Sequence, residues 1–216
     1  MLALQLRQDA ASRLKILCLG SHSDDIEIGC GGTILRLLSS NQNVQVVWVV
    51  FSSSKERERE ARSSAELFLE QAKQKEIIVN DFRDGYFPFE GAKIKDFFEE
   101  LKRVSPDLIL THNRKDAHQD HRLIAELTWN TFRDHLILEY EIPKYDGDMG
   151  QPSVFVPIEE EICQKKVRYI MDAFESQHQK RWFQQETFLS LMQLRGMECN
   201  APSGFAEAFY CRKVVL

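Results

Sequence analysis

The sequence predicts an α/β fold, a doubly wound and mostly parallel sheet with helices on both faces. Short apolar segments alternate with longer segments of helical apolar spacing, and this happens four times in the first 135 residues. Such alternation is typical of parallel strands joined by helices. No internal repeat and no linker rich in Gly, Pro and Ser interrupts the 216 residues, so we expect one domain over residues 1–216.

The expected strands are short apolar runs. The run 14–20 ends in Gly, and the run 44–51 is almost entirely β-branched or aromatic, which suits buried central strands. The run 107–111 is entered through Pro106. In order, the expected strands are 14–20, 44–51, 76–80, 107–111 and 136–141, followed by an extended end over 206–215.

The expected helices carry their apolar residues on one stripe. The segment 33–38 follows a Gly pair, and the charge-rich segment 54–74 has a stripe that includes Ala61, Ala65 and Phe68. In order, the expected helices are 33–38, 54–74, 93–104, 120–132, 158–174 and 183–194.

Composition narrows the classes of protein. The hydrophobic fraction of 43% and the charged fraction of 28% are ordinary for a soluble domain. The net charge of −5 argues against a nucleic-acid partner, which favours a basic surface. No apolar stretch has the length of an integral membrane segment, and Arg7, Asp9 and Arg13 interrupt the N-terminus where a secretion signal would be apolar. We therefore expect a cytoplasmic protein.

The five cysteines are scattered and form no CxxC pair. That pattern fits reduced thiols and argues against a structural zinc knuckle. We expect Cys18 and Cys211, which lie in strand-like runs, to be small buried apolar residues.

Polar residues gather after the first and fourth expected strands. His22, Asp24 and Asp25 follow the first strand, and the run from His112 to His121 follows the fourth. In a doubly wound sheet, ligands bind beyond the carboxyl ends of the strands, so both loops reach the same edge. Burying such groups without partners would cost several kcal/mol each. A shared polar site is therefore expected.

This residue set suits a catalytic zinc. Such a site needs three protein ligands from His and carboxylate, an open position for water, and a base that takes the proton of that water. Adjacent carboxylates at Asp24 and Asp25 point in different directions, so one can bind the metal while the other faces the water. His121, near the start of a helix, can aim at the same metal, and His118 lies just before it.

The motifs resemble those of the LmbE-like, or PIG-L, family of zinc-dependent N-deacetylases. The family motif Ala-His-Pro-Asp-Asp-Glu, followed by Gly-Cys-Gly-Gly-Thr, is similar to the segment 22–33 here. The family motif His-x-Asp-His is similar to 118–121. The helix motif Arg-x-x-Glu-Ala resembles 57–61, and Tyr-Ala-Glu-Ala-Phe resembles 205–209. The likeness covers most of the chain, in the family's order.

The resemblance implies an LmbE-type, Rossmann-like fold and a role for each motif residue. His22, Asp25 and His121 would bind Zn²⁺, with another divalent metal such as Fe²⁺ left open. Asp24 would be the general base. His118, oriented by Asp120, would stabilise the oxyanion or protonate the leaving amine. The implied substrate is an N-acetylated sugar or sugar conjugate, most often an N-acetylglucosamine compound.

The sequence departs from the family pattern at two positions. Ser23 replaces Pro, and Ile26 stands where Glu follows the Asp pair, with Glu27 one residue later. The implied ligands and base are unaffected, whereas the shape of the site near Ile26 and Glu27 is left open. Oligomeric state, the carrier of the sugar and the pathway are also left open, including whether the chain forms a homo-oligomer.

Several residues keep two interpretations. His112 either lines the site or is a hydrogen-bonded strand-end residue. Arg57 either reaches a substrate or belongs to a solvated helix start, and Glu207 either rims the site or is structural. His135 and His178 are interpreted as surface or structural residues. Three aromatic side chains near loops either stack on a sugar ring or pack: Tyr140, Tyr145 and Trp182.

A Rossmann-like enzyme that binds a nucleotide or S-adenosylmethionine is the alternative, because 29–32 is Gly-rich and follows the first strand. The polar stretch 22–25 intervenes between strand and glycines, and the second strand ends in Phe51-Ser52-Ser53 without the acidic residue that would hold a ribose. We expect instead that the glycines allow close packing of the first helix.

Overall fold

A computed structural model describes residues 13–41 and 43–215 of the chain. The N-terminal stretch 1–12, used above to argue against a secretion signal, lies outside this description. The strands are β1 (Leu14–Gly20), β2 (Val44–Val50), β3 (Gln74–Val79), β4 (Leu108–His112), β5 (Leu136–Tyr140), β6 (Val154–Pro157) and β7 (Ala206–Tyr210). The helices are α1 (Asp25–Ser40), α2 (Lys55–Phe68), α3 (Gly91–Leu101), α4 (Gln119–Thr131), α5 (Glu160–Ala173) and α6 (Gln185–Cys199), with short 3₁₀ turns η1 (Phe87–Phe89), η2 (Lys102–Val104) and η3 (Glu175–Gln177).

The described strands form one seven-stranded sheet in the order β3-β2-β1-β4-β5-β7-β6. The pairs among β1 to β5 are parallel, and β7 runs antiparallel to both β5 and β6. The predicted mostly parallel α/β sheet is therefore confirmed. The strand order reverses direction between β1 and β4, which are neighbours in the sheet. Their carboxyl ends consequently bring two loops together that are about 90 residues apart in the chain.

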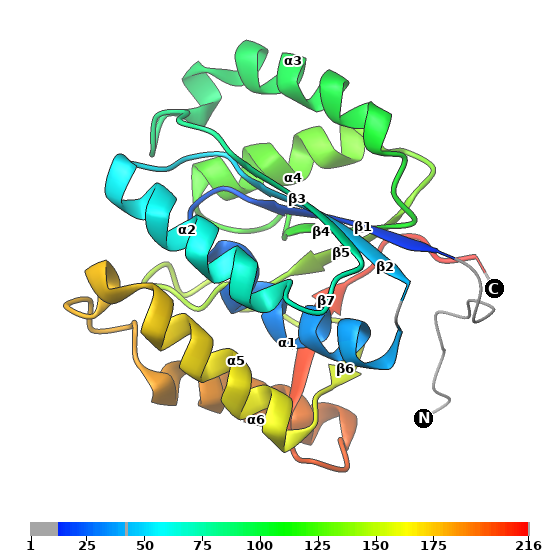
Figure 1. The fold of residues 1–216 in the computed structure, drawn as a ribbon, viewed down its shortest axis with the longest axis vertical. Helices are drawn as coiled ribbons and strands as arrows, with labels where there is room; N and C mark the ends of the chain where they lie inside the picture. The colour runs from blue at the N-terminus through cyan, green and yellow to red at the C-terminus, as the bar shows by residue number, and fades with distance from the viewer. Residues whose placement is uncertain (1–12, 42, 216) are drawn as a thin grey trace.

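Helices cover both faces of the sheet, as Figure 1 shows, with α3 and α4 on one side and α1, α2, α5 and α6 on the other. Along β1, Ile16 and Cys18 face the larger cluster, while Leu17 and Leu19 face the α3–α4 side. This alternation explains why the run is apolar throughout, since both faces of a central parallel strand are buried.

Helix α1 begins at Asp25, eight residues before the expected start at 33. The early start was not predicted because Gly is a poor helix former. Three of the glycines face bulky groups: an added Cβ would lie 2.2 Å from the Tyr140 ring at Gly29, 2.6 Å from Phe68 at Gly31 and 2.9 Å from Glu207 Oε1 at Gly32. The expected close packing is therefore confirmed. The same burial removes the cofactor alternative, because these glycines form no open phosphate-binding loop.

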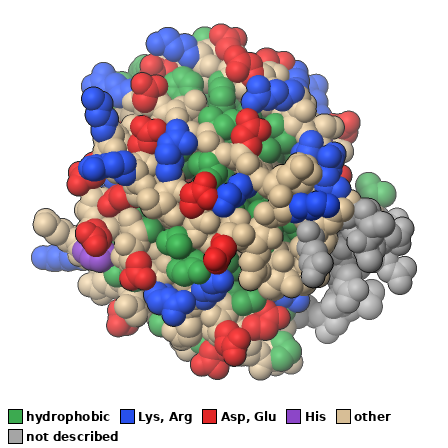
Figure 2. All heavy atoms as spheres, in the orientation of Figure 1, with side chains coloured by type: hydrophobic (Ala, Val, Ile, Leu, Met, Phe, Trp, Pro, Cys, Tyr) green, Lys and Arg blue, Asp and Glu red, His purple; other side chains and the backbone are tan. Residues whose placement is uncertain are grey.

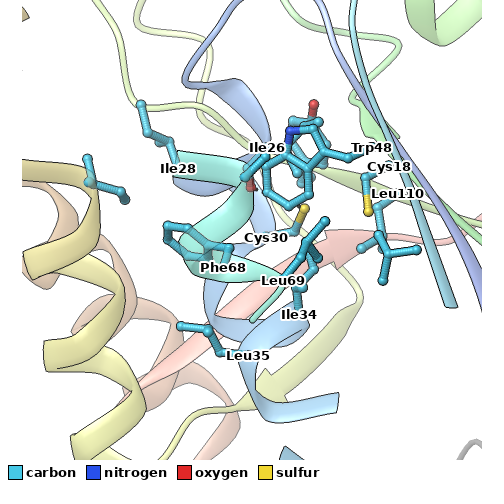
Figure 3. Packing of buried hydrophobic residues seen from close by; sticks show 14 of the residues in the cluster. Cys18, Ile26, Ile28, Cys30, Ile34, Leu35, Trp48, Phe68, Leu69 and Leu110 are labelled. Atoms are coloured by element: carbon cyan, nitrogen blue, oxygen red, sulfur yellow. Dashed lines mark hydrogen bonds between the residues drawn. The ribbon is translucent and has the colours of Figure 1, made fainter. Parts of the chain in front are cut away.

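The core between α1, α2 and the sheet is apolar. Figure 3 shows Cys30 of α1 directed at Trp48 of β2, and the ring centroid of Phe68 on α2 lies 6.3 Å from that of Trp48. Cys18, Cys30 and Trp48 are fully buried, and all five cysteines are free thiols. Cys211 differs from its prediction: it follows β7 and is half-buried, because the strand ends at Tyr210.

Other elements also differ from the sequence prediction, as three examples show. Helix α2 ends at Phe68, and the following residues lead into β3, which begins at Gln74. Strand β6 was not predicted, since it is a four-residue edge strand that ends in Pro, and edge strands tolerate Pro. The last strand is shorter than expected and stops at Tyr210.

The exterior carries both signs of charge. On the face drawn in Figure 2, acidic and basic side chains are interspersed, and neither sign forms a continuous surface. Among the residues that the model describes, no helix combines the length and the apolar composition needed to cross a bilayer.

Candidate functional site

The two polar loops meet at the carboxyl ends of β1 and β4. Pairing continues past the strands, since Phe51 N–H donates to Gly20 O at 2.9 Å and Ser52 N–H donates to Ser21 O at 2.8 Å. The first loop is therefore held by the sheet up to the residue before His22. The second loop leads from β4 into α4, whose first turn carries His121.

Three possible ligand atoms form a nearly regular triangle. His22 Nδ1 lies 3.1 Å from His121 Nε2 and 3.4 Å from Asp25 Oδ2, and the last two atoms are 3.5 Å apart. Ligands bonded to a tetrahedral zinc at about 2.0–2.2 Å are about 3.3–3.6 Å from one another. The spacing and the His₂Asp donor set therefore fit a divalent metal with one open position.

His112 lies behind this triangle as an inner wall. Its ring is fully buried and stacks on His121 with centroids 3.9 Å apart, and its Nε2 lies 3.2 Å from Asp25 Oδ2. The same nitrogen accepts the N–H of Ser21 at 2.9 Å. Because its lone pair is used by that bond, His112 supports the first loop and is not a free fourth ligand.

Electrostatics favour bound positive charge. Burial would raise the pKa of Asp25, but the neighbouring His121 and His112 hold it well below its usual range. Burial would lower the pKa of His22, but Asp120 and Asp25 outweigh burial and raise that pKa well above its usual range. Burial and His112 lower the pKa of His121. The Asp25 carboxylate is thus stabilised by positive charge beside it, and a bound cation would supply that charge while His121 stays neutral.

Asp24 occupies the N-cap position of α1, but its side chain makes no capping hydrogen bond. Its Oδ1 instead lies 3.0 Å from Nη2 of Arg57 on α2. Arg57 is itself fixed, because it donates to Glu60 at 2.9 Å and to Ser176 Oγ at 3.4 Å and lies over the Phe174 ring. Of the two interpretations of Arg57, the structure supports contact with the site.

His118 is the N-cap residue of α4, where its Nδ1 accepts the N–H of Asp120 at 3.3 Å. With Nδ1 as acceptor, the neutral ring carries its proton on Nε2. The ring centroid lies 5.0 Å from that of His22 and 4.6 Å from that of His121. Burial lowers the pKa of His118, with help from His121 and His22, so a neutral ring that can donate from Nε2 is favoured at neutral pH.

The carboxylate of Asp120 does not orient the His118 ring, which corrects the sequence-based expectation. It accepts the N–H groups of Gly85 at 2.6 Å and Phe87 at 3.1 Å, and its Oδ2 lies 3.5 Å from His22 Nε2. The reason is geometric: within the first turn of α4 the Asp120 side chain points toward the turn after β3. Only its backbone reaches His118.

Sequence reasoning missed two carboxylates behind the histidines. Asp116 Oδ2 lies 3.0 Å from His121 Nδ1, and Asp116 Oδ1 accepts the N–H of His118 at 2.8 Å. Asp84 Oδ1 lies 3.0 Å from His22 Nε2. Such acceptors orient the ring of a metal-binding histidine. Asp116 could have been suspected from its place between the histidines of one loop, whereas nothing local marks Asp84.

The remaining candidates divide clearly. Tyr140 is fully buried and donates to Leu19 O at 2.6 Å, so it packs and cannot stack on a ligand. Trp182 packs against neighbouring aromatic rings, whereas Tyr145 is 73% exposed. Glu207 is buried against α1 and does not rim the site. His135 and His178 lie away from the described site and are partly or fully exposed, as expected.

The sequence matches a known protein family over more than half of its length. The model of the PIG-L family, described as GlcNAc-PI de-N-acetylase, matches residues 17–132. The chain belongs to the PIG-L family. The matched part of this PIG-L protein contains both polar loops, so every residue of the ligand triangle lies inside it.

Individual relatives are more distant from this PIG-L chain. Diacetylchitobiose deacetylase of Thermococcus kodakarensis is 28% identical over 121 residues, which is 50% of this chain and 45% of that protein. The match therefore spans about half the length of this curated relative.

Two solved structures share the fold. The N,N'-diacetylchitobiose deacetylase of Pyrococcus horikoshii has a TM-score of 0.73 at 20% identity, covering 92% of this chain and 83% of that one. The 4-carboxy-2-hydroxymuconate hydratase of Pseudomonas putida has a TM-score of 0.72 at 18% identity, covering 94% and 98%. Since a deacetylase and a hydratase share this fold, the fold alone does not specify the reaction.

Proposed function

We propose that this protein is a metal-dependent N-deacetylase that hydrolyses the acetamide of an N-acetylated sugar or sugar conjugate. The observation that carries the proposal is the triangle of His22 Nδ1, Asp25 Oδ2 and His121 Nε2, with sides of 3.1–3.5 Å, in a chain of the PIG-L family. A zinc ion held there would supply a water of lowered pKa and polarise the amide carbonyl.

The chain's own residues then divide the proton transfers. Asp24 accepts the proton of the attacking water, and Arg57, at 3.0 Å, holds the Asp24 carboxylate in place. His118 donates from Nε2 to the developing oxyanion, and stabilising that charge is typically the largest catalytic contribution. As the C–N bond breaks, the proton that Asp24 accepted passes to the leaving amine, either directly or through His118, and acetate is released. Asp120 holds the turn 84–87 against the site through Gly85 and Phe87.

The substrate class is proposed from the family and its relatives. The family is described by a de-N-acetylase of an N-acetylglucosamine lipid, and the curated relative is a diacetylchitobiose deacetylase. We infer that an N-acetylglucosamine-type ring binds with its acetamide at the triangle. The carrier of that sugar is left to experiment.

An amine-release assay over a panel of N-acetylated sugars, free and attached to a nucleotide or lipid, tests the proposal. Zinc-loaded protein is expected to release acetate and a primary amine in equal amounts. Asp24→Asn is expected to abolish release while about one zinc per chain stays bound. Retained activity in Asp24→Asn would remove the base assignment, and a wild type that binds no divalent metal would remove the reaction.

A further inference from the structure

Lys144 belongs to the connection between β5 and β6, yet its ammonium group is almost buried. The segment 141–153 contains no helix or strand, and the Lys144 side chain is 10% exposed. Its Nζ lies 3.0 Å from Asp116 Oδ2 and 2.8 and 2.7 Å from the two carboxylate oxygens of Asp148. Two carboxylates therefore surround one buried cation.

The first of these carboxylates also supports a candidate metal ligand. Asp116 Oδ2, which receives Lys144, is the same oxygen that lies 3.0 Å from His121 Nδ1. Asp116 Oδ1 accepts the N–H of His118 at 2.8 Å. One carboxylate thus joins Lys144 to both histidines that α4 brings to the site.

The second carboxylate adds an independent connection to the same loop. Asp148 Oδ2 accepts the N–H of Ala117 at 2.6 Å, next to Asp116 in the chain. The segment 141–150 is therefore attached to the loop 112–118 at two adjacent points. Lys144 lies at the centre of both attachments, because it bonds Asp116 and Asp148 together.

The position of Lys144 restricts how Asp116 can move. Without the ammonium group, Asp116 Oδ2 would keep only its contact with His121 Nδ1, so Oδ2 and the ring could shift together. The direction of a histidine ring at a metal is set by the acceptor on its far nitrogen. Fixing Asp116 Oδ2 therefore fixes His121 Nε2 toward His22 and Asp25.

We propose that Lys144 is a positioning residue of the metal site: through Asp116 it aims His121, and through Asp148 it fastens the segment 141–150 to the same loop. Tyr145, adjacent to Lys144, is 73% exposed. A ligand that contacts the segment 141–150 there would affect the contact of Asp116 with His121. The inference rests on the proposed metal-dependent function, because it assigns His121 to the metal.

The test compares Lys144→Met, which keeps the aliphatic stem, with Lys144→Arg, which keeps the charge. Lys93→Met is the matched control, since the Lys93 side chain is 75% exposed on α3. Zinc affinity is measured by competition with a chelator, and the absorption spectrum of the cobalt-substituted protein reports ligand geometry. We expect Lys144→Met to weaken zinc binding by about tenfold or more and to change the cobalt spectrum. Lys144→Arg should restore most of the affinity, and Lys93→Met should match wild type.

Wild-type zinc affinity and an unchanged cobalt spectrum in Lys144→Met would overturn the proposal, even if the variant melted at a lower temperature. If Lys144→Met does not fold, Lys144→Gln takes its place in both measurements, and wild-type zinc affinity with an unchanged cobalt spectrum would equally overturn the proposal. The deacetylase proposal fails separately, when wild type binds zinc but releases no amine. The comparison of Lys144→Met with wild type still decides the role of Lys144 in that case.

Discussion

The contact between Arg57 and Asp24 changes how the proposed base can be regarded. The Asp24 carboxylate lies 3.0 Å from the Arg57 guanidinium, whose planar donors hold a carboxylate in one orientation. Arg57 is held by Glu60 and Ser176, so it cannot simply turn away. Orientation is therefore the contribution that we expect to dominate.

Removing Arg57 should reduce turnover more than metal binding. Arg57→Met is expected to lower kcat by about tenfold or more, since it frees Asp24, while zinc affinity stays near wild type. Arg59→Met, two residues along the same helix and exposed, is the control. Steady-state kinetics and chelator competition measure both effects. Equal losses in Arg57→Met and Arg59→Met would contradict the assignment.

Glu27, two residues after Asp25, is a buried carboxylate that lowers the stability of the fold at high pH. It is fully buried, and the Ser64 hydroxyl beside its carboxylate only partly offsets that burial. Burial raises its pKa from 4.5 to about 8. The folded chain therefore keeps a proton that the unfolded chain loses, and the free energy of unfolding falls as pH rises from about 4.5 to about 8.

Glu27→Gln should remove this pH dependence in the metal-free protein. Each pKa unit corresponds to roughly 1.4 kcal/mol, so the variant should exceed wild type in stability at pH 8 by a few kcal/mol and by little at pH 5. Urea unfolding at the two pH values measures the difference. Glu66→Gln is the control, because the Glu66 side chain is 59% exposed. Its difference in stability from wild type should be the same at both pH values. If the stability difference between Glu27→Gln and wild type is also the same at both pH values, Glu27 is not the cause of the pH dependence.

At the scale of the element, α1 shows how tertiary packing overrides helix propensity. Its glycines allow Tyr140, Phe68 and Glu207 to approach the helix backbone. Glu207 accepts the N–H groups of Gly32 at 2.8 Å and Thr33 at 2.7 Å. The helix that starts with Asp25 is thus fixed by contacts that a side chain at these positions would displace.

Gly29→Ala should destabilise the fold by about 1–3 kcal/mol, because the added methyl group overlaps the Tyr140 ring. Gly91→Ala is the matched control. A Cβ at position 91 would meet nothing within 4 Å, and Ala is a better helix former than Gly, so this variant should be as stable as wild type or slightly more stable. Chemical denaturation of both variants gives the comparison. A Gly29→Ala variant as stable as Gly91→Ala would show that the helix has room to move.

The fold was largely predictable because burial and periodicity act over a few neighbouring residues. The central strands and the two polar loops were found in this way. The start of α1 was not, since the partners of Gly29 and Gly32 lie more than a hundred residues away. Strand β6 was also missed, because a short edge strand carries little pattern.

The same limit applies to the candidate site. His22, Asp25 and His121 carry a motif, and the structure brings them together. Asp84 reaches His22 across 62 residues of chain, and no local pattern records that contact. Asp120 was assigned the wrong contact for a similar reason: the direction of its side chain depends on the turn after β3.

At the scale of the whole molecule, metal binding should raise the free energy of unfolding and the Tm. A ligand that binds only the folded state, at a concentration of about 100 times its Kd, adds about 2.7 kcal/mol. In a chain of this length that corresponds to a rise in Tm of roughly 5–10 °C. Zinc added to chelator-treated wild type should produce this rise. His121→Ala should lose the rise and the exposed His178→Ala should keep it, whereas an equal response in both would contradict the site.

Glu207 also accepts Lys166 of α5 at 2.6 Å, and Lys166 donates to Ile28 O at 2.7 Å. Both residues lie beyond residue 132, where the match to the PIG-L family ends. The matched portion 17–132 consequently depends on the rest of the chain, since Glu207 of β7 and Lys166 of α5 bond the backbone of its first helix. A chimera made with a relative to exchange substrate preference should therefore take α1, Lys166 and Glu207 from the same parent protein.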